Sequence, residues 1–130
     1  MGFNEHNGIS VGEGPTVHMV ADERVRNASG SMHGGMFVAL LDSAMGRAIR
    51  LRVGEGPVIL TMQLSSTFLQ KAHLGDELVA TGEVVRLSRR TAFANGELVR
   101  ASDGQVLAQA QGTFALRHLG GLGGGVDDSA

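Results

Sequence analysis

The segment from Met36 to Ile49 is the most apolar stretch of the chain, and it limits the possible folds more than any other feature. It contains no proline, is rich in Ala, Leu and Met, and is apolar almost all round, which is typical of a helix buried on most sides. A helix of this kind must be covered by another layer of secondary structure. The remainder of the chain therefore has to supply that layer.

Four strand candidates after the helix can supply it. They alternate apolar and polar residues with period two, the pattern of a sheet with one buried face. The pair Asp103-Gly104 predicts a hairpin turn between the last two, and residues 15–25 begin as a further extended segment. The strand candidates are residues 58–69, 77–88, 90–101 and 105–118. This order predicts an α+β fold in which one helix covers an antiparallel sheet, and it lacks the βαβ alternation of doubly wound nucleotide-binding domains.

The alternation in residues 58–69 also predicts which side chains face the helix. Leu60, Met62 and Leu64 stand at even positions, and we expect them to pack into the core. Thr61 belongs to the polar set at odd positions. The pattern therefore places its side chain on the polar face of the strand.

The composition excludes several classes of function. With 130 residues, 42% of them hydrophobic, the chain is long enough for one domain with a core, which we place at residues 15–118 between flexible segments 1–14 and 119–130. A net charge of −2 and only 4% aromatic residues argue against nucleic-acid binding. No apolar run approaches the roughly 20 residues that cross a bilayer, so no membrane association is expected. The absence of cysteine excludes a thiol nucleophile and fits a cytoplasmic location.

Asp42 is the one carboxylate in the apolar helix. Its side chain could lie on a solvent-facing stripe with Ser43 and Arg47, make a buried structural hydrogen bond, or belong to a catalytic site. A desolvated carboxylate in a cleft is poised to act as a base or a nucleophile. The sequence around Asp42 leaves these three alternatives open.

His33, Gly34 and Gly35 stand at the start of the helix, where the glycines are unexpected because glycine is a poor helix former. Glycine lets another group approach the backbone closely, and the first helical turn carries unpaired N–H groups at the positive end of the helix dipole. Such a terminus can hold a phosphate or the oxyanion that develops on a carbonyl under attack. The alternative is that the glycine pair only permits a tight turn beside the sheet.

The spacing of Gly34 and Asp42 adds a geometric constraint. Eight helical residues separate them by about 12 Å at a rise of ~1.5 Å per residue, so one reacting carbonyl group cannot reach both within one chain. If both act on the same bond, they come from two copies whose helices lie side by side and antiparallel. The pair then works only in a dimer.

The pattern Asn-x5-His-Gly-Gly-x6-Asp, which runs from Asn27 to Asp42, is followed by the segments STFLQKAHLGDELVATGEVVRLSRR and DGQVLAQAQGTF. Together these segments resemble the hotdog-fold acyl-CoA thioesterases of the phenylacetate-pathway type, similar to hydroxybenzoyl-CoA thioesterase, over residues 15–118. The resemblance implies a curved antiparallel sheet wrapped around one central helix, a homodimer with a continuous sheet, and commonly a homotetramer. It implies hydrolysis of an acyl-CoA thioester, with coenzyme A as part of the substrate and no separate cofactor.

The resemblance also implies roles for single residues. Asp42 matches the catalytic carboxylate that activates water or attacks the thioester, and the Gly34 N–H matches the group that polarises the thioester carbonyl. His33 matches a histidine that orders the loop, and Asn27 matches a polar residue that positions the carbonyl or the water. Thr61 aligns with a Ser or Thr beside the nucleophilic water, although ordinary strand polarity explains a threonine there equally well.

A coenzyme A substrate implies contacts with its nucleotide phosphates. Gly35 shapes the same turn as Gly34. Arg86, Arg89 and Arg90 form the densest basic cluster, and arginines at the end of a strand suit phosphate contacts, with a solvated strand end as the alternative. The remaining histidines show no metal-ligand spacing, so no metal is expected.

Two rival functions stay open at this stage. A hotdog dehydratase or hydratase usually carries its histidine in a longer, proline-containing loop, which SMHGG lacks. A non-catalytic acyl-CoA binding module would keep the pocket without a competent acid, and the presence of Asp42 argues against it. The acyl group is undetermined because flexible and aromatic side chains could line either an aromatic or an aliphatic pocket. The candidates for this lining are Met32, Met36, Phe37, Met62 and Phe68.

Overall fold

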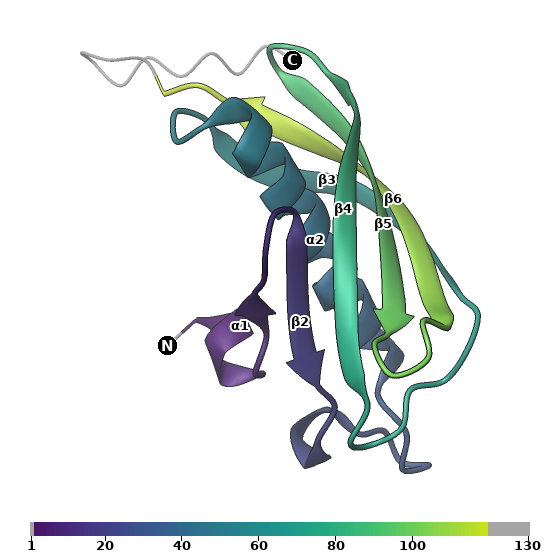
Figure 1. Ribbon diagram of the computed structural model, residues 1–130. Helices are drawn as coiled ribbons and strands as arrows, with labels where there is room; N and C mark the ends of the chain where they lie inside the picture. The colour runs from purple at the N-terminus through teal and green to yellow at the C-terminus, as the bar shows by residue number, and fades with distance from the viewer. Residues whose placement is uncertain (1, 120–130) are drawn as a thin grey trace.

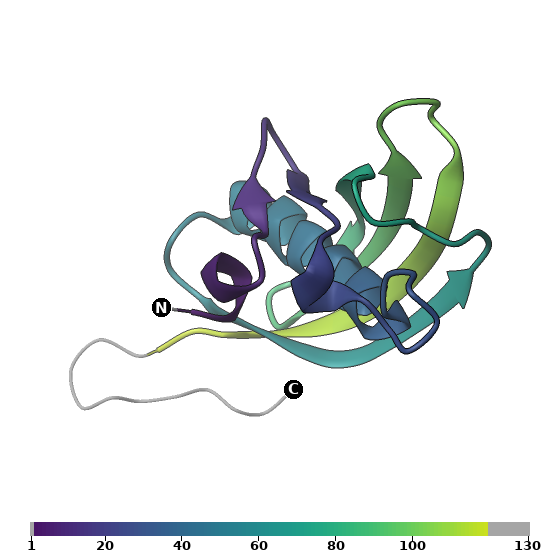
Figure 2. The same ribbon diagram turned by 90° about the horizontal axis from the view of Figure 1, so that it is seen from below.

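A computed structural model describes residues 2–119, which form a curved sheet and one long helix (Figure 1). The six strands make one antiparallel sheet in the order β1-β2-β4-β5-β6-β3, and helix α2 (Gly34–Val53) lies across its concave face (Figure 2). A short helix α1 (Phe3–His6) and a 3-10 turn η1 (Glu23–Val25) complete the elements. The strands are β1 (Ser10–Val11), β2 (Thr16–Val20), β3 (Val58–Phe68), β4 (Glu77–Leu87), β5 (Thr91–Arg100) and β6 (Val106–Arg117). The predicted α+β architecture is confirmed, including the hairpin that joins β5 to β6.

Helix α2 is longer than the predicted segment 36–49 because both of its ends are capped. At the start, the His33 ring accepts a hydrogen bond from the Gly35 N–H at 2.9 Å, so the helix begins at Gly34 in spite of the glycines. At the end, Gly54 adopts a φ of 74°, which suits glycine, and its N–H donates to the Arg50 carbonyl at 2.9 Å. Capping thus overrides the low helix propensity of the first turn.

Small residues on β4 and β5 let the helix lie close to the sheet. Gly82 and Gly96 are paired across these strands, and Ala44 and Met45 of α2 pack directly over them. A Cβ atom at Gly82 would overlap the Ala44 carbonyl group, so this position excludes any side chain unless the helix shifts. The core between the two layers therefore depends on glycine where the helix crosses the sheet.

Strand β3 confirms the predicted orientation of Leu64 but contradicts that of Leu60 and Met62. Leu60 and Met62 are 40% and 66% exposed, whereas Ile59 and Leu64 pack against the core. A bulge between Thr61 and Gln63 shifts the register with β6 and reverses the alternation at this point. Residues before the bulge face the helix from odd positions, which the simple two-residue period missed.

The first residues of the chain also differ from their prediction. Composition predicts a flexible segment over residues 1–14, but the structure places α1 and β1 there, and β1 pairs with β2. Ile9 is buried at 6% exposure and belongs to the core. The Arg24 guanidinium fixes this segment by donating to the His6 carbonyl at 2.9 Å. Of the predicted tail, residues 120–130 lie outside the described part of the chain.

Candidate active site

Asp42 projects from the middle of α2 toward β3, where it meets Thr61. The Thr61 hydroxyl donates a hydrogen bond of 2.6 Å to Oδ1 of the half-buried Asp42 carboxylate. The bulge after Thr61 makes this contact possible because it turns the threonine toward the helix. Of the three alternatives left open for Asp42, the structure shows the stripe with Ser43 and Arg47 and adds a hydrogen bond from Thr61, and a catalytic role for Asp42 stays a prediction. The structure also contradicts the placement of Thr61 with Gln63 on the polar face.

Asp42 and Thr61 line a cavity of about 340 Å³, which we call the Asp42 cavity. Its walls come from α2, from Ile59 and Phe114 of the sheet, and from the N-terminal segment through Asn4. Asn4 also reaches the helix, since its Nδ2 donates to the Ser43 hydroxyl at 3.3 Å. Such a volume is at the lower end of the range for small-molecule sites.

One backbone N–H group at the start of α2 has no acceptor among the described residues. A helix has four N–H groups at its start without helical acceptors, here those of His33 to Met36. Three find partners, because His33 donates to the Val25 carbonyl, Gly35 to the His33 ring, and Met36 to the His33 carbonyl. Among residues 2–119, the Gly34 N–H has no hydrogen-bond acceptor. A donor without an acceptor at the positive helix end suits a developing oxyanion.

His33 and Gly35 hold the backbone around this donor. The Nδ1 atom of His33 accepts the Gly35 N–H, so the proton of the neutral ring sits on Nε2 in this arrangement. A Cβ atom at Gly35 would lie 3.0 Å from His33 Nδ1, closer than an ordinary contact. Glycine at position 35 therefore keeps the histidine cap in place.

Asn27 organises the loop before the helix rather than reaching the Asp42 cavity. Its Oδ1 accepts hydrogen bonds from the backbone N–H groups of Ser29 and Ser31 at 3.0 and 3.1 Å. Its Nδ2 donates to the hydroxyl of the buried Ser31 at 3.2 Å. A direct role of Asn27 toward a reacting carbonyl or water stays a prediction.

The LGD segment at residues 74–76 supports the same loop from the sheet side. Gly75 has a φ of 96°, and Asp76 accepts a hydrogen bond from the His73 N–H at 2.9 Å. That hydrogen bond, together with the Arg100 guanidinium at 3.1 Å, lowers the pKa of Asp76 below its usual value. The turn carries His73 into a bridge with Ser31, which ties the loop to the sheet.

Gly34 and Asp42 of one chain do not share a cavity. Gly34 lies against the ring of Phe68, where its Cβ would stand 3.4 Å away, while Asp42 bonds to Thr61 seven residues earlier on β3. Phe68 in turn packs edge-on against Phe37, with 5.8 Å between the ring centroids. The two groups thus lie at separate points along β3.

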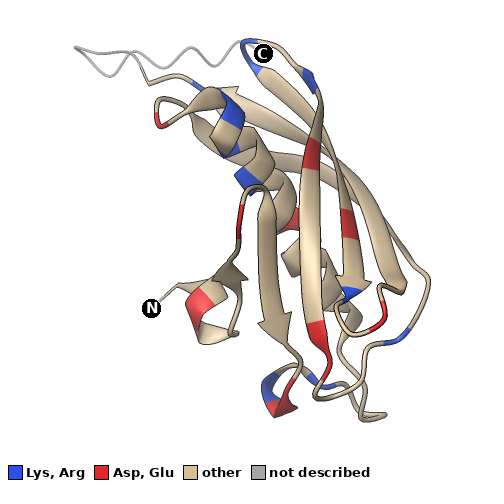
Figure 3. Ribbon diagram, viewed as in Figure 1, with Lys and Arg blue, Asp and Glu red and all other residues tan. Residues whose placement is uncertain are grey.

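The arginines predicted for phosphate contact lie away from these groups. Arg86 lines a hollow on the sheet face opposite to α2, and Arg89 and Arg90 stand in the β4–β5 turn. Figure 3 shows basic residues at this turn, at the end of the sheet far from the start of α2. The 11 residues of β4 place them about 33 Å from the Gly34 end, at ~3.3 Å per residue. Their contact with phosphate stays a prediction.

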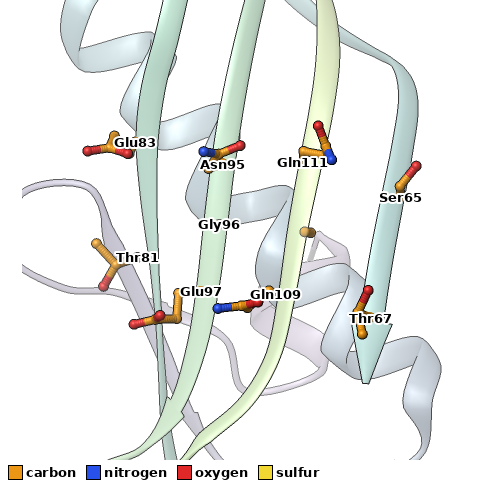
Figure 4. Close-up of a pocket in the computed structure, with 10 residues that line it drawn as sticks. Ser65, Thr67, Thr81, Glu83, Asn95, Gly96, Glu97, Gln109 and Gln111 are labelled. Carbon is orange, nitrogen blue, oxygen red and sulfur yellow. The ribbon is translucent and has the colours of Figure 1, made fainter. Parts of the chain in front are cut away.

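A larger hollow, the outer groove, lies on the open face of the sheet and measures about 530 Å³. Its side chains stand in two rows across β4, β5, β6 and β3 (Figure 4). The rows are Glu83, Asn95, Gln111 and Ser65, then Thr81, Glu97, Gln109 and Thr67. Among the described residues that line this groove, none is basic and none belongs to the predicted site.

Within residues 2–119, no group of three or more His, Asp or Glu side chains is arranged to hold a metal ion. The same residues contain no helix long and apolar enough to span a membrane. Of the residues proposed for the acyl pocket, Met32, Met36 and Phe37 are buried, whereas Met62 and Phe68 are exposed, and their contact with an acyl group stays a prediction.

The family is decided by a family model. Residues 29–107, which include Gly34, Asp42 and Thr61, match the model described as "Thioesterase superfamily". The chain belongs to this superfamily. The predicted hotdog fold and the predicted thioester-hydrolysing enzyme are thereby confirmed.

Thioesterases are also among its relatives and structural neighbours. The human protein named acyl-coenzyme A thioesterase 13 is 28% identical over 113 residues, covering 86% of this chain and 78% of that protein. Protein PA5202 from Pseudomonas aeruginosa superposes with a TM-score of 0.82 at 26% identity, over 89% of this chain and 94% of that one. The phenylacetic acid degradation protein PaaI from Thermus thermophilus gives a TM-score of 0.75 at 26% identity, over 87% and 96%. The resemblance to the phenylacetate-pathway type is confirmed.

The structure adds residues that the motif did not reveal. Ser43, Gly46, Arg47 and Arg50 line the Asp42 cavity together with Asp42. Ser43 and Arg47 belong to the stripe predicted with Asp42, and their spacing of three and four residues could have shown that Gly46 and Arg50 share the same face of the helix. Asn4 had no sequence signal, because only the tertiary contact brings α1 to this place.

Proposed function

We propose that the protein hydrolyses an acyl-CoA thioester to the free acid and coenzyme A, with Asp42 as general base or nucleophile. The observation that carries this proposal is the Asp42 carboxylate fixed by the Thr61 hydroxyl at the edge of a cavity. The acyl-CoA substrate is taken from the relative named acyl-coenzyme A thioesterase 13.

The Thr61 hydrogen bond occupies Oδ1 of Asp42 and leaves Oδ2 for the reaction. As a general base, Oδ2 removes a proton from water while the water oxygen attacks the thioester carbon. As a nucleophile, Oδ2 attacks that carbon itself and forms an anhydride, which water then hydrolyses. In both routes the C–S bond breaks, and coenzyme A leaves as a thiolate that regains a proton.

The Gly34 N–H of a second copy is proposed to stabilise the oxyanion. Strand β3 is an 11-residue edge strand that pairs, within residues 2–119, only with β6, and an exposed edge of this length favours pairing with another strand. An antiparallel β3–β3 pair with its two-fold axis between Leu64 and Ser65 sets Phe68 of one copy opposite Thr61 of the other. Because Gly34 contacts Phe68 and Asp42 bonds to Thr61, this pairing brings the two groups together.

The remaining assignments follow from the same arrangement. His33 and Asn27 hold the Gly34 backbone in place, and the His33 Nε2–H is a further donor near the thioester. A homotetramer, a cytoplasmic location and phosphate contacts by Arg86, Arg89 and Arg90 complete the proposal.

Release of coenzyme A, followed with a chromogenic thiol reagent, tests this function. Wild-type protein should release thiol from an acyl-CoA, and Asp42→Ala and Asp42→Asn proteins should not. The same assay separates hydrolysis from an acyl-CoA binding module and from a dehydratase or hydratase, neither of which releases thiol. Native rates in both Asp42 variants would refute the assignment.

A further inference from the structure

One face of α2 forms the floor of the Asp42 cavity. It consists of Asp42, Ser43, Gly46, Arg47 and Arg50, which share one side of the helix because members three or four residues apart are neighbours there. Asp42 stands at one end of this floor and Arg50 at the other. Figure 3 shows basic residues gathered on the C-terminal half of the helix.

Gly46 keeps this floor open although neither backbone geometry nor packing requires a glycine. It lies inside the helix, where glycine is less stable than alanine, and its φ is not positive. A Cβ atom at Gly46 would meet nothing within 4 Å, in contrast to Gly82, where it would overlap the helix backbone. The empty volume over Gly46 is therefore space that a ligand can occupy.

Arg47 and Arg50 bring two positive charges to the cavity. Among the described residues, their side chains donate hydrogen bonds only to backbone carbonyls, from Arg47 Nε to Gly14 at 2.8 Å and from Arg50 to Gly54 and Pro57 at 2.6 and 2.9 Å. Within the described part of the chain, neither guanidinium lies within 4 Å of a carboxylate. Each guanidinium therefore has further N–H donors available to a ligand. Its planar pair of N–H groups can bind both oxygens of a carboxylate.

The distance of the arginines from Asp42 indicates which part of an acyl-CoA they would contact. Along the helix axis, Arg47 and Arg50 lie about 7.5 and 12 Å beyond Asp42 at ~1.5 Å per residue. The thioester carbon must lie beside Asp42 for the reaction. An acyl chain of several carbons spans this interval, whereas the pantetheine arm carries the phosphates of coenzyme A much farther from the thioester.

We propose that the Asp42 cavity is the acyl pocket and selects acyl-CoA substrates whose acyl chain ends in a carboxylate. The reaction it serves rests on the proposed function. Gly46 supplies the room for the chain, and Arg47 and Arg50 bind the terminal carboxylate. Arg47 and Arg50 thereby determine specificity without touching the reacting atoms.

Binding to the Asp42→Asn protein tests the proposal, because that variant should not consume its ligand. Titration calorimetry with adipyl-CoA and hexanoyl-CoA compares two six-carbon acyl groups that differ in a terminal carboxylate. We expect adipyl-CoA to bind about tenfold more tightly, and Arg47→Gln or Arg50→Gln to remove that preference. Arg52→Gln is the matched control, since Arg52 is exposed on the same helix, does not line the cavity, and its loss changes the net charge equally.

Gly46→Leu and the binding of free coenzyme A test the assignment of the acyl pocket without changing either arginine. Gly46→Leu should weaken both six-carbon ligands about tenfold by filling the cavity, and should leave the binding of coenzyme A unchanged. Tighter binding of hexanoyl-CoA, or a preference for adipyl-CoA that survives in both arginine variants, would overturn the proposal. Weaker binding of coenzyme A itself in both arginine variants would also overturn it, since the arginines would then hold a phosphate.

The proposal and the proposed function fail in different ways. If the expected binding preference is found and the wild-type protein releases no thiol from adipyl-CoA, hydrolysis is refuted and the pocket assignment stands. If thiol is released at least as fast from hexanoyl-CoA and no binding preference exists, hydrolysis stands and the carboxylate specificity is refuted.

Discussion

The two faces of the sheet each carry a hollow, and the smaller one holds the candidate catalytic groups. The outer groove is the larger, at about 530 against 340 Å³, but its amides, hydroxyls and two carboxylates repeat along the strands without a catalytic pairing. The Asp42 cavity combines an acid, a hydroxyl hydrogen-bonded to it and two cations. The comparison teaches that the combination of groups identifies a site better than its volume does.

The largest difference between the faces is expected in catalysis. Asp42→Asn removes the base or nucleophile and should lower kcat by about 10²–10⁴-fold. Glu83→Gln, the matched change in the outer groove, should leave kcat within about twofold because that carboxylate lies away from the reaction. Steady-state thiol release measures both. A large loss in Glu83→Gln would reverse the assignment of the two hollows.

A substitution on the covered face should destabilise the fold, whereas its neighbour on the open face should not. Gly82→Val forces a side chain against the Ala44 carbonyl and should lower the free energy of unfolding by about 1–3 kcal/mol or more. Thr81→Val, one residue earlier and in the outer groove, should change it by less than about 0.5 kcal/mol. Urea titration provides the comparison, and equal losses would show that the helix does not depend on Gly82.

The Thr61 hydroxyl should contribute a smaller amount to activity. Thr61→Val keeps the shape and removes the hydrogen bond to Asp42, so we expect kcat to fall about tenfold with little change in KM. Ser65→Ala on the same strand, in the outer groove, should have no such effect. An unchanged kcat in Thr61→Val would mean that Asp42 is positioned by other contacts.

The smallest effect concerns the turn that supports the helix start. Because hydrogen bonding to His73 and the charge of Arg100 lower the pKa of Asp76, its carboxylate stabilises the fold at neutral pH. That contribution is lost as the pH falls below about 4, the usual pKa of an aspartate side chain. The stability difference between wild type and Asp76→Asn, measured by urea titration at several pH values, should therefore shrink on acidification. A stability difference between the two proteins that grows on acidification would contradict the lowered pKa of Asp76.

Much of this account could be predicted from the sequence, and the failures have local causes. The helix and strands followed from periodicity, and the motif supplied Asp42 and Gly34 as candidates for the site. The orientation of Thr61 could not be predicted, because one bulge residue reverses the alternation of β3 and leaves no mark in composition. The ordered N-terminal segment was missed because Ile9 and Arg24 fix it through tertiary contacts. Arg47 was predicted only as part of a stripe with Asp42, and Arg50 carried no sequence signal, so the shape of the cavity was needed to bring both into the site.

The central claim is that Asp42 of one copy works with the Gly34 N–H of another. Gly34→Pro removes this N–H at the first helical position, where proline is tolerated, and the extended His33 backbone suits a following proline. Asp42→Asn and Gly34→Pro proteins should each be inactive, but their co-refolded mixture should recover about a quarter of wild-type activity, since half of the dimers are mixed and each has one intact site. No recovery in a mixture shown to contain mixed dimers would contradict the shared site.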